Sequence, residues 1–202
     1  MFDTVLIANR GEIACRIIAT ARKLGIHTIA IYSDADANAR HVRLADAAYR
    51  VGGSPATESY LQIDNVLEVA QKSGAEAIHP GYGFLSENAD FAQACVDKGV
   101  VFIGPPPDAV RLMGAKDQAR RLMNRAGVPV VPGCNDLNID LKVVLSEARK
   151  IGYPVIIKAA SGGGGRGMRI VDEELQLPEA LKSASRESMT AFANDKMLLE
   201  KF

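Results

Sequence analysis

The segment YPVIIKAASGGGGRGMRIV, residues 153–171, limits the folds open to this chain more than any other. Residues 155–157 form a short β-branched run, which favours a buried strand over a helix, and Lys158 follows directly. A second strand pattern, residues 168–171, comes after the glycines of residues 162–165. Because glycine has no Cβ, several backbone N–H groups of such a loop can turn toward one anion. The sequence therefore predicts a strand, a glycine loop and a strand that cover the triphosphate of a nucleotide.

Other glycine motifs fit this segment less well. Residues 162–167 formally match G-x-G-x-x-G, but a dinucleotide site needs a helix to begin there, and a strand pattern follows instead. A P-loop needs Lys and then Ser or Thr after its last glycine, where this chain has Met168 and Arg169. A flexible linker stays open as an alternative, although it would not need strand patterns on both sides. The predicted arrangement resembles the glycine flap over the ATP phosphates of protein kinases, except that here the lysine precedes the loop.

Composition indicates a globular protein without a general affinity for charged polymers. The 202 residues suffice for one large domain or two small ones, with 48% hydrophobic and 24% charged residues. Lys and Arg number 24, as do Asp and Glu, so no net charge favours nucleic acid or a membrane surface. No apolar stretch has the length of a bilayer span, and no basic leader precedes the first apolar run. We expect a cytoplasmic protein, or one of the mitochondrial matrix if a transit segment has been removed.

The residues that most often bind metals are not spaced for it. There is no C-x-x-C motif, the cysteines are widely separated, and the histidines show no ligand spacing. We therefore predict reduced cysteines and no metal ligands within the chain. These residues are Cys15, Cys95, Cys134, His27, His41 and His79.

Up to about residue 104, strand and helix patterns alternate. Alternation of this kind predicts an α/β fold with a mostly parallel, doubly wound sheet. The predicted strands are residues 5–8, 26–32, 75–79 and 100–103, and the predicted helices are residues 13–24, 63–74 and 87–98.

Two loops follow strands of this sheet, where ligands of such folds bind. Residues 9–12 follow the first strand, and residues 79–88 mix aromatic, glycine and polar side chains. Ligand binding and plain turn chemistry with helix capping are equally good interpretations of both loops. Nicotinamide binding is disfavoured, because residues 9–11 lack the spaced glycines of a dinucleotide site.

Three prolines at residues 105–107 mark a boundary in the chain. We predict an α/β domain of residues 1–113, a helical linker of residues 114–129 and a small α+β domain of residues 130–202. The last should contain a helix, the two strands around the glycines, a second helix and a final strand near residues 196–200.

Several motifs together resemble one family, the biotin carboxylase component of biotin-dependent acyl-CoA carboxylases, a branch of the ATP-grasp ligases. The resemblance extends over the whole chain, with the motifs in the family's order. They are NRGEIACRI (residues 9–17), HPGYGFLSEN (79–88), FIGP (102–105), MGAK (113–116), the glycine segment and LLEKF (198–202).

The resemblance implies a Rossmann-like parallel-sheet N-terminal domain, then a small α+β ATP-grasp lid domain, with the third ATP-grasp domain absent. It implies an enzyme that uses ATP and bicarbonate to make carboxyphosphate and then carboxylates carrier-bound biotin. The family's catalytic groups, its ligands for Mg²⁺ and its groups for bicarbonate and biotin would lie after residue 202, so the chain alone is expected to be catalytically incomplete. The implied partners are a biotin carboxyl carrier protein or domain, a carboxyltransferase subunit and a second copy of the chain. Which acyl-CoA accepts the carboxyl group stays open.

The resemblance also implies a set of ATP-binding residues. Two lysines match those that the family places on the phosphates, the glycines match the flap, and the last three residues match the strand at the adenine. The set is Lys116, Lys158, Gly163, Gly164, Gly165, Arg166, Gly167, Glu200, Lys201 and Phe202.

Local alternatives remain for some of these residues. Lys116 fits a solvated helix lysine, Lys158 fits a salt bridge, and Arg166 fits a residue that faces water. Glu200 and Lys201 fit a plain strand end. A non-catalytic nucleotide-binding or assembly module of the ATP-grasp type is therefore the second hypothesis for the whole chain.

Overall fold

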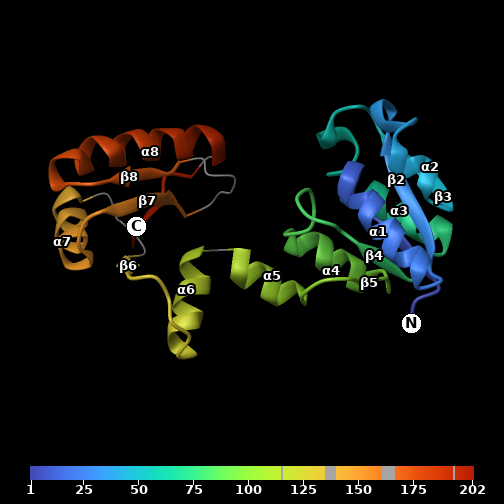
Figure 1. The fold of residues 1–202 in the computed structure, drawn as a ribbon, viewed down its shortest axis with the longest axis horizontal. Coiled ribbons are helices and arrows are strands. Elements are labelled where there is room, and N and C mark those ends of the chain that lie inside the picture. Colours follow the sequence, from blue (N-terminus) through green and yellow to red (C-terminus); the bar gives the residue numbers. More distant parts are fainter. Residues whose placement is uncertain (115, 135–139, 161–166, 193) are drawn as a thin grey trace. The chain divides into compact units, whose positions relative to one another are not determined.

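The computed structural model describes residues 1–114, 116–134, 140–160, 167–192 and 194–202, with the backbone alone for residues 116, 117 and 192. The chain divides into two compact units, Met1–Arg111 and Leu112–Phe202 (Figure 1). The predicted glycine loop, residues 161–166, lies outside the described residues. The finer division into a linker of residues 114–129 and a domain of residues 130–202 stays a prediction.

The first unit contains a five-stranded parallel sheet in the order β3-β2-β1-β4-β5. This confirms the predicted parallel sheet and its α/β class. The strands are β1 (Thr4–Ile7), β2 (His27–Ser33), β3 (Ala47–Gly52), β4 (Ala77–His79) and β5 (Val101–Phe102).

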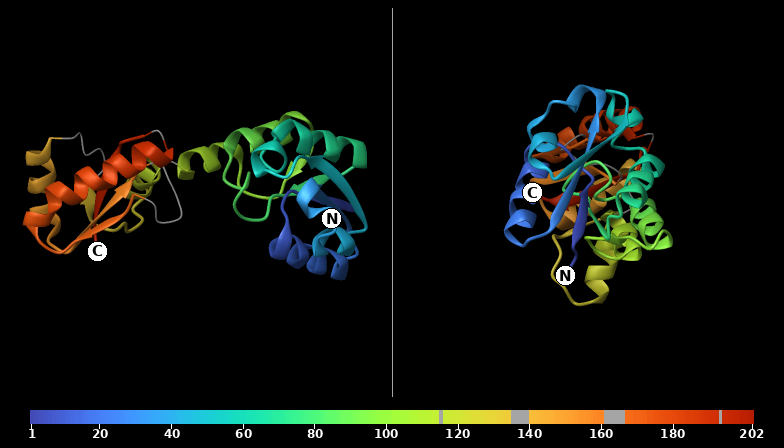
Figure 2. Two further views of the ribbon diagram at one scale, coloured as in Figure 1. Left: turned by 90° about the horizontal axis from the view of Figure 1, so that it is seen from above. Right: turned by 90° about the vertical axis from the view of Figure 1, so that its right-hand side faces the viewer.

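Helices cover both faces of this sheet. Leu6 of β1 packs into the larger core with α3 and α4, whereas the next residue, Ile7, packs against Ala14 and Ile18 of α1. Adjacent residues of a strand point to opposite faces, so α1 and α3 lie on opposite sides of the sheet (Figure 2). The helices of this unit are α1 (Gly11–Lys23), α2 (Arg40–Leu44), α3 (Ile63–Ser73) and α4 (Ala89–Asp97).

Besides two short 3-10 helices, Asp34–Asp36 and Ala56–Glu58, the first unit contains a strand and an α-helix that the sequence did not predict. β3 is an edge strand that pairs only with β2, and α2 has only five residues. An edge strand that is buried on little of its length shows weak alternation, and a helix this short shows no periodicity.

The second unit contains a four-stranded sheet in the order β6-β9-β7-β8, with antiparallel pairing throughout. The two strands predicted around the glycines are present as neighbours, β7 and β8. The strands are β6 (Gly133–Cys134), β7 (Val155–Ala159), β8 (Arg169–Val171) and β9 (Met197–Lys201), and the helices are α6 (Lys116–Arg125), α7 (Leu141–Ile151) and α8 (Leu177–Phe192). The division between the units falls within α5 (Pro107–Gly114).

One face of this second sheet forms the core of its unit, and α8 lies along that face (Figure 2). Val155, Ile157 and Leu199 are fully buried there against α7 and α8. Residues of the other parity, among them Lys158 and Glu200, point to the opposite face. We call this opposite side the Lys158 face.

None of the helices in the described ranges is long and apolar enough to cross a membrane.

Candidate functional site

Lys158 and Glu200 form an ion pair on the Lys158 face. The Nζ atom of Lys158 lies 2.5 Å from Oε2 of Glu200, and the side chains are 28% and 19% exposed. In the register of β7 and β9, Lys158 pairs with Leu198 and Ile156 pairs with Glu200, so the two charged residues are diagonal neighbours. Long side chains on one face of a sheet can interact at that spacing. The structure therefore brings together two of the residues implied for ATP.

Arg120 of α6 is a third charged member of the site. Its Nη1 lies 3.6 Å from Oε1 of Glu200, and its side chain is only 10% exposed. Its Nη2 donates a hydrogen bond to the backbone oxygen of Val131, just before β6. A Cβ on Gly133 would lie 2.3 Å from the backbone oxygen of Leu199 and 2.7 Å from the guanidinium, so a side chain at residue 133 would displace the strand or Arg120. The Glu200 carboxylate thus faces two cations, one from β7 and one from α6.

Gly167 holds one end of the predicted glycine loop. It is buried, with φ of +68°, and a Cβ there would lie 3.3 Å from Cβ of Ala159. At the other end, Ala160 donates its backbone N–H to the oxygen of Lys196 at 2.9 Å. Both flanks are therefore fixed by the second unit. The intervening predicted residues, Gly163, Gly164, Gly165 and Arg166, lie outside the described residues.

Lys201 does not join this cluster. Its ammonium donates hydrogen bonds of 2.9 Å to the backbone oxygens of both Gly152 and Tyr153, at the turn between α7 and β7. Strand alternation places its side chain on the opposite face from that of Glu200. Its ammonium therefore stabilises a turn, which leaves only its backbone for the predicted contact with a nucleotide.

Two more predicted residues lie in the second unit. Phe202 is 62% exposed, and its N–H donates to the oxygen of Pro154 at 3.2 Å. Lys116 is the first residue of α6, and its side chain is outside the described part of the chain.

The sequence analysis missed Arg120. Its position four residues after Lys116 was the available indication, because helix residues with that spacing share a face. Within the described ranges, no group of three His, Cys, Asp or Glu side chains could hold a metal ion.

The two loops singled out in the first unit bind each other. The side-chain amide of Asn9 donates hydrogen bonds of 2.8 Å to the backbone oxygens of Pro80 and Tyr82. A Cβ on Gly81 would lie 2.8 Å from this amide, which explains why glycine stands there. Asn9 therefore ties the carboxyl ends of β1 and β4 together.

Arg10 extends this contact toward β2. Its guanidinium lies over the rings of Tyr60 and Phe84, 5.4 and 5.6 Å from their centroids, and forms a 3.0 Å ion pair with Asp36. The Tyr60 hydroxyl donates to the same Asp36 carboxylate at 2.6 Å. These groups satisfy one another, which favours a structural role for the loops.

The titratable groups of this network have shifted pKa values. Partial burial opposes ionisation of Asp36, but hydrogen bonds from Tyr60, Arg10 and Ser33 hold its pKa below the ordinary value. Burial and the hydrogen bond to Asp36 raise the pKa of Tyr60 to about 12. Burial also lowers the pKa of His41, which is consistent with a neutral ring.

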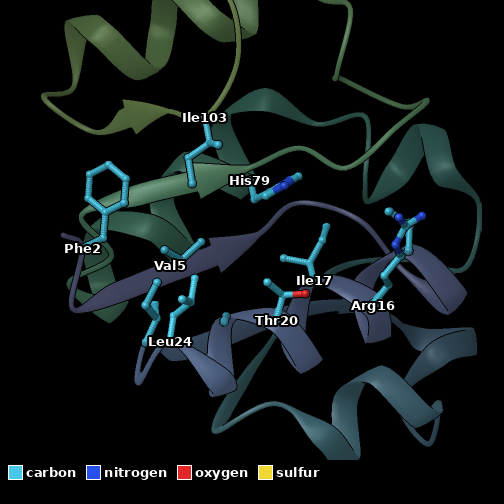
Figure 3. A pocket seen from close by; sticks show the side chains of 11 residues that line it. Phe2, Val5, Arg16, Ile17, Thr20, Leu24, His79 and Ile103 are labelled. Carbon is cyan, nitrogen blue, oxygen red and sulfur yellow. The ribbon is translucent and has the colours of Figure 1, made fainter.

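A groove of about 400 Å³ lies between α1 and the sheet of the first unit. Val5, Ile17 and Leu24 line it, with Arg16 and His79 toward one end (Figure 3). Its lining is mainly apolar, so it offers little to bind a polyphosphate.

Comparison with known protein families matches both halves of the chain. Residues 1–110 match the biotin carboxylase N-terminal domain. Residues 115–202 match the ATP-binding domain of the carbamoyl-phosphate synthase L chain.

Individual proteins are similar over nearly the whole chain. The α subunit of mitochondrial methylcrotonoyl-CoA carboxylase from Dictyostelium discoideum is 52% identical over 98% of this chain and 28% of its own length. Biotin carboxylase 1 of Bacillus subtilis is 50% identical over 100% of this chain and 45% of its own. A crystal structure of the biotin carboxylase domain dimer of Hydrogenobacter thermophilus 2-oxoglutarate carboxylase, in complex with MgADP, ADP and bicarbonate, superposes with a TM-score of 0.91 at 48% identity, over 100% of this chain and 44% of that one.

The chain thus spans less than half the length of each of these relatives. The N-terminal family model alone covers more than half of its 202 residues, and the second model covers most of the rest. This chain therefore belongs to the biotin carboxylase family, of which it holds the N-terminal and ATP-binding portion.

Proposed function

We propose that the second unit binds ATP on its Lys158 face, with the ammonium of Lys158 on a phosphate. The observation that carries this proposal is the ion pair of Lys158, on the strand that leads into the glycine segment, with Glu200 of the neighbouring strand β9. Among the described residues the Lys158 ammonium pairs with the Glu200 carboxylate, and at 28% exposure it can exchange that partner for a phosphate oxygen.

The neighbouring residues support the same site. Ile156 and Leu198 share the Lys158 face and are buried, so apolar side chains flank the ion pair and limit its contact with water. We assign the phosphates further to Lys116 and to the backbone of residues 163–167, with Arg166 beside them, and the base to the backbone of residues 200–202. We also propose that the first unit is a Rossmann-like domain and that the second unit is an ATP-grasp lid domain.

For the longer protein we propose biotin carboxylation: ATP and bicarbonate form carboxyphosphate, and carrier-bound biotin receives the carboxyl group. The Hydrogenobacter domain, with its ADP, magnesium and bicarbonate, supports this choice of substrates. Within the described residues no group of three His, Cys, Asp or Glu side chains could hold a metal ion, and we propose that the ligands for Mg²⁺ belong to the rest of the longer protein. The proposed partners are a biotin carboxyl carrier, a carboxyltransferase subunit and a second copy of the chain, in the cytoplasm or the mitochondrial matrix.

Titration calorimetry of residues 1–202 with ATP and with NAD tests the ATP site. We expect binding of ATP in preference to NAD, and a loss of about 10-fold in ATP affinity in Lys158→Ala, since one charge-assisted contact to phosphate is worth about 1.5 kcal/mol. Lys182→Ala, on the exposed side of α8, is the matched control and should bind as the unchanged protein does. Equal affinities in the Lys158 and Lys182 variants would remove Lys158 from the site.

Turnover separates the enzyme from the second hypothesis, a non-catalytic module. We expect residues 1–202 to bind ATP but to show little bicarbonate-dependent ATP hydrolysis, because phosphoryl transfer needs a metal ion to neutralise developing charge. The corresponding full-length protein should hydrolyse ATP when bicarbonate is added. A full-length protein that binds ATP without any such hydrolysis would favour the module.

A further inference from the structure

We propose that Arg120 is a positioning residue for nucleotide binding, which keeps the Glu200 carboxylate in place while Lys158 moves to a phosphate. The inference rests on the ATP site proposed above and adds a residue of α6 to it. Three observations support it: the contacts of Glu200, the way Arg120 is held, and the difference in exposure between the two cations.

The first observation is that Glu200 faces both cations with different oxygens. Its Oε2 contacts Lys158 at 2.5 Å, whereas its Oε1 lies 3.6 Å from Arg120. The closer partner is Lys158, so any anion that binds Lys158 must compete with this carboxylate. Without a second cation, release of Lys158 would leave a carboxylate that is only 19% exposed without charge compensation.

The second observation is that Arg120 is fixed independently of Glu200. Its guanidinium also donates to the oxygen of Val131 and lies against Gly133, where a Cβ would come within 2.7 Å. A planar guanidinium with several donors can hold a backbone oxygen and a carboxylate at the same time. Arg120 therefore presents a stationary positive charge to Glu200.

The third observation is that the two cations differ in exposure. Lys158 is 28% exposed and has a flexible four-carbon stem, whereas Arg120 is 10% exposed. The lysine can thus change partners while the arginine remains. Arg120 lowers the free energy needed to free Lys158 and contacts no phosphate itself.

A double-mutant cycle on residues 1–202 tests this role. The variants are Arg120→Met, Glu200→Gln and both together, with Arg120→Lys as the conservative replacement. Arg125→Met, an exposed arginine of the same helix, is the control for net charge. Each protein is titrated with ATP and with adenosine, which has no phosphate for Lys158, and its thermal midpoint is measured without ligand.

We expect Arg120→Met to weaken ATP binding about 10-fold and adenosine binding less than about 2-fold, with a large part of the affinity restored in Arg120→Lys. In the Glu200→Gln background the same substitution should change ATP affinity less than about 2-fold, because no carboxylate then needs a second cation. Without ligand, the midpoint shifts of Arg120→Met and Glu200→Gln should not add.

Three results would overturn the inference while leaving the ATP site intact. These are a loss of ATP affinity of the same size in both backgrounds, equal losses for ATP and adenosine, or additive midpoint shifts in the ligand-free protein. If the unchanged protein binds no ATP, the proposed function itself fails, and the positioning role fails with it.

Discussion

Gly167 shows how one residue sets the geometry beside the candidate site. Its φ of +68° lies in the left-handed region, and the residue is packed against Ala159 and against Ala184 and Ser188 of α8. Ser188 is itself buried and donates to the backbone oxygen of Asn194 at 2.6 Å. Gly167, which lies just before β8, therefore packs the start of that strand against α8, and the Ser188 hydrogen bond holds α8 in place.

Replacement of Gly167 by alanine should lower the free energy of unfolding of the second unit by about 1–2 kcal/mol. The left-handed backbone conformation is unfavourable for alanine, and its methyl group would come 3.3 Å from Cβ of Ala159. Urea unfolding measures the change. Gly114→Ala is the control, since its φ is not positive and nothing lies within 4 Å of its Cβ position. Equal destabilisation by both substitutions would contradict the backbone explanation.

His41 makes the stability of the first unit depend on pH. The ring is buried, Nε2 lies 3.2 Å from the oxygen of Ile31, and Nδ1 accepts a weak hydrogen bond from the N–H of Gly11 at 3.4 Å. These contacts suit a neutral ring whose Nε2 carries the proton. Burial lowers its pKa below 6.5, as it does for His79.

The contribution of these histidines to the free energy of unfolding should therefore be complete above about pH 6.5. It should decrease as the pH falls from there toward the pKa of the folded state. In that window the unfolded chain binds a proton that the folded ring resists, at up to about 1.4 kcal/mol per pH unit for each histidine. His41→Gln should reduce the slope between pH 7 and 5.5 without abolishing it, because His79 contributes with the same sign. Chemical unfolding at several pH values gives the slope; an unchanged slope in His41→Gln would show that His41 is not its source.

Among the elements, α4 is a helix whose start can be traced to one side chain. Asn88 has extended backbone angles, and its Oδ1 accepts the N–H of Phe91 at 2.9 Å. The helix then buries Phe91 and Cys95 in the core of the first unit. The Asn88 cap thus sets the residue at which α4 begins.

Asn88→Ala should cost about 1 kcal/mol of stability in the first unit, because it leaves an N–H of the first turn without its acceptor. Asn88→Ser keeps an acceptor and should cost less. Glu87→Ala, one residue earlier and exposed, serves as the control. Thermal or urea unfolding gives the differences, and an alanine variant as stable as the serine variant would refute the capping role.

The same elements show what sequence patterns can predict. The buried β-branched runs of β1, β2 and β7 and the glycine stops of α1 and α3 gave the parallel sheet and the strands beside the glycines. Lys158 was predicted as a site residue from its place between a buried run and the glycines, and Glu200 from the family motif. Arg120 was not, because its ion pair depends on how α6 meets β9, and no local pattern records that contact. Because adjacent residues of a strand point to opposite faces, the sequence could have predicted that Glu200 and Lys201 have different surroundings. The family motif assigned both residues to the nucleotide because it does not distinguish the two faces.

At the scale of the molecule, each unit has a core of its own. The buried clusters of the first unit draw on residues between 6 and 102, and that of the second unit on residues between 144 and 199. The two family models match the chain with a similar division, residues 1–110 and 115–202. We therefore expect each unit to have a free energy of unfolding of its own.

Two core truncations test this independence. Phe91 and Leu199 are both fully buried, one in each core, and replacement of either by alanine should lower the stability of its unit by about 2–5 kcal/mol. Substitutions without shared contacts act separately, so amide exchange should accelerate in β1 and α4 for Phe91→Ala and in β7 and α8 for Leu199→Ala. In each variant the amides of the other unit serve as the internal reference. Exchange that accelerates equally in both units after either substitution would mean that the cores open together, and nucleotide bound to the Lys158 face would then stabilise the first unit as much as the second.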